Sequence, residues 1–440
     1  MSADPILGAR AARRPAVRRR RALPAKLAVI ALLGASAGGA QVAPRWTPHT
    51  VLAETKTAWS RPTITADARG HVHVLWADRA EAAAPGQDAK GDGLYHRSWD
   101  GQQWSAPVRV FAKDSNMFCV IFPDATVGND DELYVVWSEQ GSLYFNHAPA
   151  ETAHDPDAWS SATRVVQASM IDQSRIVRDT KGRLHVVYTR LASDDGPGGN
   201  VFSVFSDDDG QTWSTPQQVS RVPTDAQIVV ATPRLVLDRT GALHTVWSEP
   251  HAPNWISWRV LYARSDDGGH TWSEPLPLAA PPNDTNNNVG PSLVSTGRNT
   301  LHFVWGCIGP PKRCYRTSVD GGRTWSPTAL AFDRYVSMAG WDALVADANA
   351  NLDLVAQLRM PYGMYHAFKP AGLAWQAPVR FVGEKGFEDG HFVSAVAVGT
   401  GVHAVWQKGP GTGDVVYAYM TLAGDAATAP ADPTPAATPP

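Results

Sequence analysis

One phrase of about fifteen residues recurs seven times along the chain, and no other feature limits the possible folds as strongly. Its first copy runs from Pro62 to Trp76, and the later copies end at Trp137, Tyr188, Trp247, Trp305, Ala356 and Trp406. Each copy predicts two short strands joined by a turn, because apolar residues run together or alternate with polar ones. A regular spacing of roughly 40 to 60 residues indicates a repeat architecture.

Two further strands follow the phrase in most units. A third strand is predicted at residues 93–98, 200–206, 260–265 and 415–419, and the fourth opens at Trp104, Trp159, Trp213, Trp272, Trp325 and Trp375. The seventh unit ends after its third strand, whereas residues 45–52 read as a fourth strand without a unit. We therefore predict an all-β propeller of seven four-stranded blades, in which the N-terminal strand closes the last blade. Six blades with one degenerate unit is the alternative.

Composition narrows the class of function. The 440 residues carry a formal net charge of -3, without the basic excess typical of nucleic-acid binding, so we expect no nucleic-acid partner. The high content of Trp, Gly and Pro favours short strands and tight turns. Five histidines precede the strand-two aromatic by three residues: His73, His185, His244, His302 and His403. A repeated position indicates packing rather than metal ligation, and we expect no metal or other cofactor.

The two ends of the chain read differently from the repeats. A basic stretch at residues 10–26 leads into an apolar run at 27–33 and then small residues, which predicts a signal peptide at 1–40. That run is too short for a membrane span. We assign 41–423 to the propeller domain and 424–440 to a disordered Ala/Pro/Thr tail. The expected protein is a monomer, either secreted or held in the periplasm or cell envelope, and the export route stays open.

Three cysteines bear on that prediction. In an oxidising compartment Cys307 and Cys314 are close enough in sequence to close one loop, but a free pair is equally compatible with the spacing. Cys119 is then left over, and a small buried apolar residue is its simplest interpretation.

Three turns between the third and fourth strands share the pattern Ser-x-Asp-x-Gly-x-Thr-Trp, at residues 206–213, 265–272 and 318–325. They resemble the Asp box of sialidases and related BNR-repeat proteins. Degenerate copies occur at 98–104 and 368–375. Asp and Ser side chains accept turn amides, and Gly supplies a positive φ, so the motif folds as a pin. In the family it resembles this motif lies on the rim, and we place none of its residues in a site.

The resemblance implies an enzyme that acts on extracellular glycans. The chain departs from the family's enzymes, which have six blades and an early Arg-Ile-Pro motif, because this motif is reduced to Ser60-Arg61-Pro62. The family's aspartate acid/base has two matches in the first long loop, Asp88 and Asp92, and its tyrosine nucleophile has none by motif. We expect a glycoside hydrolase or a polysaccharide lyase that acts on an acidic sugar.

Charged residues directly after the second strands predict where that chemistry lies. Carboxylates can act as acid, base or nucleophile on a glycosidic bond, and arginines can hold an acidic sugar by paired hydrogen bonds. The candidate catalytic residues are Asp78, Glu139 and Glu249. The candidate substrate-binding residues are Arg61, Arg79, Arg190, Arg359, Lys408, Trp255 and Tyr362. Three alternatives stay open: a salt-bridge network that closes the channel, a propeller that binds a glycan or a protein without cleaving it, and a structural propeller of the envelope.

Overall fold

The computed structural model describes fifteen stretches of the chain: residues 44–55, 60–78, 93–112, 122–139, 141–167, 170–191, 199–223, 228–251, 256–280, 290–307, 312–332, 342–359, 362–383, 391–408 and 413–422. The chain separates into two compact units, Met1–Gln41 and Val42–Pro440, and every described residue lies in the second. Within the described stretches, no helix is both long and apolar enough to cross a membrane.

Six blades are four-stranded antiparallel sheets whose strands follow chain order from the inside outward. Blade 1 contains β3 (Thr63–Ala66), β4 (Val72–Asp78), β5 (Gly93–Trp99) and β6 (Val108–Ala112). Blade 2 contains β7 (Asp124–Val127), β8 (Glu132–Glu139), β9 (Ser142–Pro149) and β10 (Thr163–Val166), with the short 3₁₀ turns η1 (Ala150–Thr152) and η2 (Pro156–Ala158). Blade 3 contains β11 (Ile171–Arg178), β12 (Leu184–Arg190), β13 (Asn200–Ser206) and β14 (Gln217–Gln218).

The next three blades repeat this order. Blade 4 contains β15 (Ala231–Leu237), β16 (Leu243–His251), β17 (Ile256–Ser265) and β18 (Leu276–Ala279). Blade 5 contains β19 (Ser292–Ser295), β20 (Leu301–Cys307), β21 (Lys312–Ser318) and β22 (Ala329–Phe332). Blade 6 contains β23 (Ala343–Ala346), β24 (Leu352–Arg359), β25 (Tyr362–Lys369) and β26 (Val379–Val382). The tryptophan that was expected to open each fourth strand lies a few residues before it, as Trp213 does before β14.

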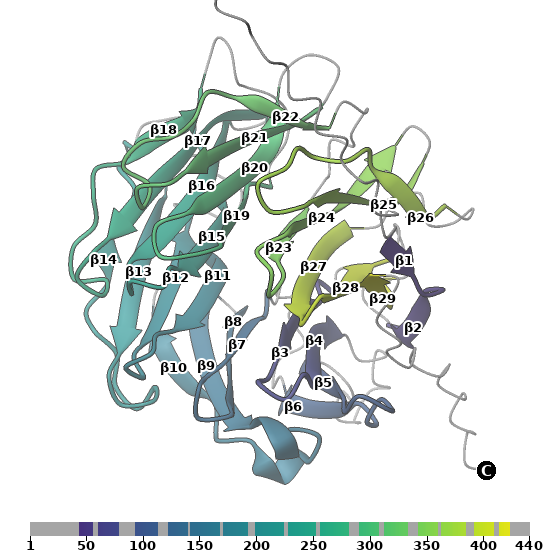
Figure 1. Ribbon diagram of the computed structural model, residues 1–440. Helices are drawn as coiled ribbons and strands as arrows, with labels where there is room; N and C mark the ends of the chain where they lie inside the picture. Colours follow the sequence, from purple (N-terminus) through teal and green to yellow (C-terminus); the bar gives the residue numbers. More distant parts are fainter. Residues whose placement is uncertain are drawn as a thin grey trace, which may run out of the picture. The chain divides into compact units, whose positions relative to one another are not determined.

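Blade 7 is built from both ends of the described chain. It contains β27 (His391–Val398), β28 (Gly401–Gln407) and β29 (Val415–Leu422), and both β1 (Pro44–Trp46) and β2 (Thr50–Ala53) pair with β29. The innermost strands contact one another in the cyclic order β3, β7, β11, β15, β19, β23, β27 and back to β3. The predicted seven-bladed all-β propeller with N-terminal closure is therefore confirmed (Figure 1).

The second strand of each blade lies in the core. It packs between neighbouring sheets, so both of its faces are apolar, and this explains the nearly continuous hydrophobic runs of the repeated phrase. Trp137, Trp247, Trp305 and Trp406 are at most 1% exposed. Trp247 of blade 4, for example, belongs to a cluster that includes Val187 of blade 3. Burial of such a side chain contributes about 2–3 kcal/mol, so the core residues themselves hold neighbouring blades together.

The Asp boxes form rigid turns at the ends of the third strands. In blade 3, the Ser206 hydroxyl donates to Asp208 Oδ1 at 2.8 Å and accepts from the Gly210 N–H at 2.9 Å. Asp208 also accepts the N–H and the hydroxyl of Thr212, at 2.8 and 2.6 Å. The same bonds recur in blades 4 and 5, around Asp267 and Asp320.

These turns also connect each blade to the one before it. The second box glycine of blade 5, Gly322, has φ +79° and lies against Tyr262 of blade 4, where a Cβ would fall 1.7 Å from the hydroxyl oxygen. Gly210 of blade 3 lies in the same way against Phe145 of blade 2. The glycine is required here both by the left-handed turn and by the close approach of the neighbouring ring.

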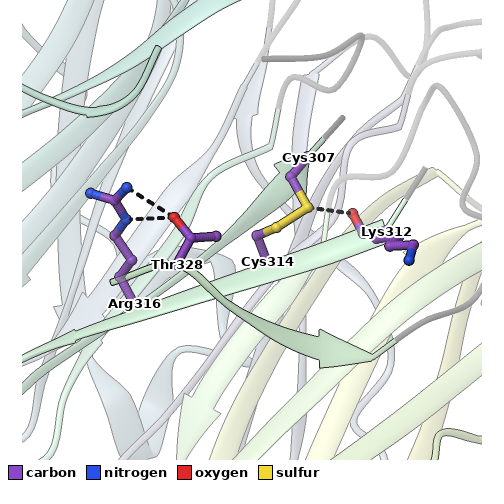
Figure 2. Close-up of a disulfide and its surroundings, with 5 residues drawn as sticks. All are labelled: Cys307, Lys312, Cys314, Arg316 and Thr328. Carbon is purple, nitrogen blue, oxygen red and sulfur yellow. Dashed lines mark hydrogen bonds between the residues drawn. A yellow bond between two sulfur atoms is a disulfide. The ribbon is translucent and has the colours of Figure 1, made fainter. Parts of the chain in front are cut away.

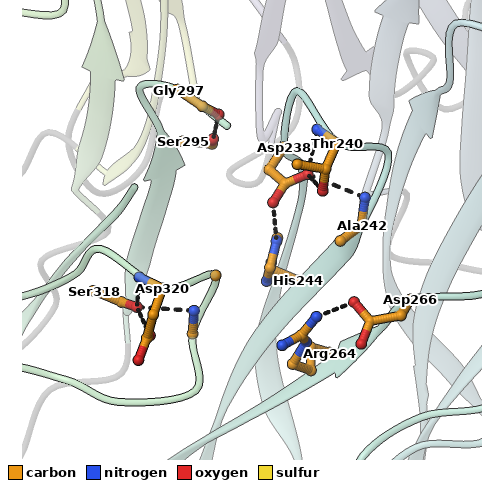
Figure 3. A network of polar contacts seen from close by, with 12 residues as sticks. Asp238, Thr240, Ala242, His244, Arg264, Asp266, Ser295, Gly297, Ser318 and Asp320 are labelled. Carbon is orange, nitrogen blue, oxygen red and sulfur yellow. Dashed lines mark hydrogen bonds and ion pairs between the residues drawn. The ribbon is translucent and has the colours of Figure 1, made fainter. Parts of the chain in front are cut away.

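The repeated histidines are hydrogen-bonded inside their own blades. His244 Nδ1 lies 2.7 Å from the Tyr262 hydroxyl, and Nε2 lies 3.2 Å from Asp238 Oδ2. Figure 3 shows that Asp238 accepts the N–H groups of Thr240 and Ala242 as well, so one carboxylate fixes both the turn and the ring. Equivalent contacts join His302 to Tyr315, His403 to Tyr417, His185 to Asp179 and His73 to His96. This is the packing role that the repeated position indicates.

Candidate functional site

A cavity of about 220 Å³ lies where the seven innermost strands begin. One residue from the first strand of each blade lines the cavity. These seven residues lie at the same level, because each pairs with the next-to-last residue of the repeated phrase in its own blade. These seven residues, which we call the inner ring, are Thr63, Asp124, Arg175, Arg234, Ser292, Ala343 and Ser394. Six of the seven are polar, so the ring can bind a polar ligand.

Most of the inner ring connects adjoining blades. Four members form hydrogen bonds to the neighbouring blade. Asp124 Oδ1 accepts from the Thr63 hydroxyl at 3.4 Å, and its Oδ2 accepts from the Ile176 N–H at 2.9 Å. Ser292 Oγ donates to the Asp342 carbonyl at 2.7 Å, and Ser394 Oγ accepts from the Ile64 N–H at 3.3 Å. These bonds have a structural explanation, because they hold neighbouring blades in register.

The two arginines of the ring, Arg175 and Arg234, differ from this pattern. Each donates to the carbonyl of its own preceding residue, Arg175 to Ser174 at 2.7 Å and Arg234 to Pro233 at 3.2 Å. Arg175 also lies 3.9 Å from Asp124 Oδ1, and its side chain is 17% exposed. Within the described stretches Arg234 forms no ion pair. Two neighbouring guanidinium groups therefore line the cavity, and only that of Arg175 forms an ion pair with a neighbouring blade among the described residues.

Backbone irregularities position this part of the ring. The pairing register of the first two strands shifts between Ile171 and Ser174 in blade 3 and between Ala231 and Arg234 in blade 4. Such bulges redirect the side chains that follow them. Thr232 also adopts φ +53°, which is costly for a β-branched residue. Strain of this kind, of about 1–3 kcal/mol, persists where the surrounding structure holds it and is concentrated at functional sites.

Electrostatics distinguish Arg234 and Asp124 from surface groups. The pKa of Arg234 is lowered to about 9, mainly by burial and also by the charge of Arg175, whereas Asp124 and Asp342 oppose the change. Burial raises the pKa of Asp124, against the opposing effects of Arg175 and the Ile176 N–H. The cavity thus contains a carboxyl group that holds a proton more readily than usual, beside two cations.

Asp342, the residue just before β23, lines the same cavity but is committed to a buried ion pair. Its carboxylate accepts from Arg313 Nε and from Nη2, the latter at 2.8 Å, and both side chains are 1% exposed. Burial raises the pKa of Asp342 and Arg313 opposes this. Arg313 directly precedes Cys314, whose disulfide with Cys307 joins β20 to β21 (Figure 2). The disulfide that the spacing left open is therefore formed, whereas Cys119 lies outside the described residues.

Arg61 is the sequence-predicted binding residue that lines the cavity. Its guanidinium carbon lies 3.3 Å from the ring centre of Phe122 and 4.9 Å from that of Phe392, as in a cation–π contact. Burial lowers its pKa to about 9, and Asp172 opposes this change. Both Arg61 and Phe392 have positive φ values, of 45° and 53°. Arg61 is therefore held rigidly, on the side of blades 1, 2 and 7.

The predicted catalytic residues lie one strand farther out than the inner ring. Glu249 is fully buried and accepts from Trp247 Nε1 at 3.0 Å and from Arg259 Nε at 2.6 Å. Glu139 is 5% exposed at the end of β8, and Asp78 is partly exposed at the end of β4. None of the three appears among the residues that line the cavity in the described part of the chain. Their catalytic role stays a prediction.

The predicted binding residues are more dispersed. Arg190 is exposed at the end of β12, and Lys408 lies 3.9 Å from Asp414. The backbones of Arg359 and Tyr362 pair across blade 6, but their side chains lie outside the described part. Arg79 and Trp255 lie outside it altogether, as do Asp88 and Asp92. Over the described stretches, no group of three or more His, Cys, Asp or Glu residues is arranged to hold a metal ion.

Asp124, Arg175, Arg234 and Asp342 line the cavity but were not predicted from the sequence, because none of them follows a second strand. A signal was available in the repeats themselves. In four copies of the phrase, a proline is followed by a polar residue whose identity differs from copy to copy: Thr63, Asp124, Arg234 and Ser292. This position lies at the start of the first strand. Because antiparallel strands place the start of strand one beside the end of strand two, this position lies at the same end of the blade and nearer the axis.

Comparison with known proteins identifies the repeats and the fold. Residues 142–357 match the model of the BNR repeat-like domain. An ulvan lyase, a polysaccharide lyase solved with bound -[GlcA(1-4)Rha3S]-, has a TM-score of 0.54 at 11% identity over 85% of this chain and 95% of its own. A second polysaccharide lyase gives 0.54 at 10% identity over 83% and 90%. A protein of unknown function from Dyadobacter fermentans gives 0.51 at 10% identity over 86% and 99%.

No curated protein sequence matches the chain. At identities near 10%, the structural likeness establishes the fold alone. The match of residues 142–357 confirms the BNR-type repeats that the three Asp boxes indicate.

Proposed function

Because this chain is a seven-bladed β-propeller with BNR-type repeats, we propose that its central cavity binds an extracellular acidic glycan and cleaves it, as a glycoside hydrolase or a polysaccharide lyase. The observation that carries this proposal is the pair Arg175 and Arg234. Two adjacent guanidinium groups in a confined cavity can bind an anion by paired hydrogen bonds. Two of the similar structures are polysaccharide lyases, which makes a saccharide anion the natural choice.

Asp124 is our candidate for the acid/base group. Burial raises its pKa, so its ionised carboxylate takes up a proton more readily than that of an ordinary aspartate, as the base that removes a proton from the sugar in a lyase reaction requires. The proton that it takes up can then pass to the glycosidic oxygen. The two arginines would hold the sugar carboxylate, and in a lyase reaction they would also stabilise the negative charge that develops on it. The groups differ in role, so a variant of Asp124 should affect turnover more than binding.

The proposed location is outside the cytoplasm, with residues 1–40 as the signal peptide and the propeller acting as a monomer. The Cys307–Cys314 disulfide supports this, because such bonds form and persist in oxidising compartments.

A non-catalytic glycan-binding propeller is the second candidate. Glycoside hydrolysis commonly uses two carboxyl groups, and of the two described ones that line the cavity, Asp342 is engaged by Arg313. This leaves Asp124 alone among the described cavity residues. Saturable binding without any product would favour this second function.

Substitution of Arg234 by glutamine is expected to weaken binding of a uronic-acid oligosaccharide about 10- to 100-fold, because a hydrogen-bonded charge is lost. The same change at Arg239, which is exposed in the turn that follows β15, serves as the matched control and should leave affinity unchanged. Affinity is measured by titration calorimetry. Equal affinities for the two variants would contradict the assignment.

Turnover is tested on a panel of sialosides, uronic-acid polysaccharides and neutral glycosides, with products identified by mass spectrometry. Release of a free sugar indicates a hydrolase and an unsaturated uronide indicates a lyase. Saturable binding of an acidic member without product leaves the binding module, and absence of binding across the panel rejects both.

A further inference from the structure

The two ring arginines do not stand alone in the cavity. Asp124 of blade 2 lies 3.9 Å from Arg175, and Asp342, at the entry to blade 6, acts on Arg234 electrostatically together with Asp124. Around the cavity the order is therefore Asp124, Arg175, Arg234, Ser292 and then the ion pair of Asp342 with Arg313. An anion that sits on the two arginines has the carboxylate of Asp124 on one side and this ion pair on the other.

This arrangement treats one negative charge differently from two. The arginines alone would accept a carboxylate, a sulfate or a phosphate, since all three offer paired acceptor oxygens. A second negative charge on the same sugar, placed towards blade 2, would lie near Asp124. At about 6 Å and an effective dielectric constant of about 20, that repulsion weakens binding roughly 100-fold, and less at higher ionic strength.

The same carboxylate favours hydroxyl groups. Asp124 Oδ2 accepts one backbone N–H, from Ile176, and Oδ1 accepts the Thr63 hydroxyl at a long 3.4 Å. An ionised carboxylate offers about four acceptor positions, and the Asp124 side chain is 18% exposed. It therefore has capacity for a sugar hydroxyl that donates from within the cavity.

Resting on the proposed function, we propose that Asp124 makes this cavity selective for a sugar that carries a single carboxylate beside free hydroxyl groups. Saccharides with a sulfate or phosphate on the same sugar are excluded. Asp124 is then a specificity-determining residue, and the arginine pair supplies affinity without distinguishing between these anions.

The test compares two probes on the full chain by titration calorimetry at one fixed salt concentration. The first is a glucuronic-acid oligosaccharide, and the second is the same compound with one sulfate on its glucuronic acid. The wild-type protein should prefer the first at least tenfold. Asp124→Asn, which keeps the shape of the side chain, should bring this preference close to one, mainly because the sulfated probe binds more tightly.

Two further variants make the result decisive. Asp157→Asn, at an exposed position in η2, is the control and should retain the wild-type preference. Ala343→Asp places an additional carboxylate in the inner ring and should increase the preference, which gives a gain-of-effect measurement even if Asp124→Asn does not fold. An unchanged preference in either Asp124→Asn or Ala343→Asp overturns the proposal.

The possible failures can be told apart. If both probes bind the wild-type protein equally well, the selectivity proposal is wrong while the glycan function stands. If neither probe binds, the proposed function is wrong, and the selectivity proposal is rejected with it.

Discussion

Between pH 7 and pH 4 the free energy of unfolding is expected to fall steeply, by roughly 3 kcal/mol for each of three buried histidines. Burial lowers the pKa of His73 and His302 to about 4 and that of His403 to about 3, from 6.5. Below pH 6.5 the unfolded chain takes up protons at these rings while the folded protein does not. The stabilisation is therefore complete above pH 6.5 and is lost as the pH falls towards 4.

Two buried carboxyls oppose this trend. The pKa values of Asp124 and Asp342 are raised by burial, so acid protonates these groups in the folded protein first and favours folding. A comparison of variants separates the contributions. His302→Gln should reduce the loss between pH 7 and pH 4 by about 3 kcal/mol, whereas the same change at the exposed His154 should not. Urea unfolding at several pH values gives the result, and equal slopes for the two variants would refute the histidine explanation.

Gly322→Ala is expected to destabilise the fold by about 2–5 kcal/mol. The left-handed φ of +79° costs about 1–2 kcal/mol for any residue with a Cβ. The additional methyl group would overlap the ring of Tyr262, which is 1% exposed and bonded to His244, so neither side can yield cheaply. Overpacking of this kind adds about 1–3 kcal/mol.

Gly372 offers a matched control for this substitution. It stands in the degenerate turn of blade 6 with φ +73°, and an added Cβ would meet nothing within 4 Å. Gly372→Ala should therefore cost the backbone contribution alone. Tyr262→Phe should partly rescue Gly322→Ala, because it removes the closest atom. Similar losses for the two glycine variants in chemical denaturation would show that the contact between blades 4 and 5 is unimportant.

The sequence predicted the fold well because the fold is encoded locally and repeatedly. Each copy of the phrase carries its own apolar strand, and the absence of a fourth strand after residue 419 pointed directly to residues 45–52 as its replacement. The Asp boxes were equally clear, since Ser206, Asp208 and Thr212 complete their bonds within one turn. The repeated phrase and the turn bonds can therefore be recognised within single segments of the sequence.

The site depends on distant partners, and this is why the sequence showed less of it. Glu249 reads as an available carboxylate after a strand, but a hairpin ten residues later returns Arg259 to pair with it. Asp342 follows no second strand, and its partner Arg313 belongs to another blade. Arg61, which stands in the reduced Arg-Ile-Pro motif, does line the cavity, and its substrate-binding role stays a prediction. The two inner-ring arginines could be predicted only if the side chains of the first strand that face the propeller axis were known. A bulge in blade 3 and another in blade 4 change which side chains these are.

Closure of the last blade also has a consequence for the order of events during synthesis. The Thr55 N–H bonds Asp414 Oδ1 at 3.2 Å across a separation of 359 residues, beside the pairing of β2 with β29. At about 5–20 residues per second, translation separates these two segments by roughly 20–70 s. Blades 1 to 6 can assemble in order during this interval, while β1 and β2 still lack the strand that they pair with. The newly made chain therefore carries open strand edges until its C-terminal hairpin emerges, and this is the period in which it is most exposed to aggregation and to chaperones.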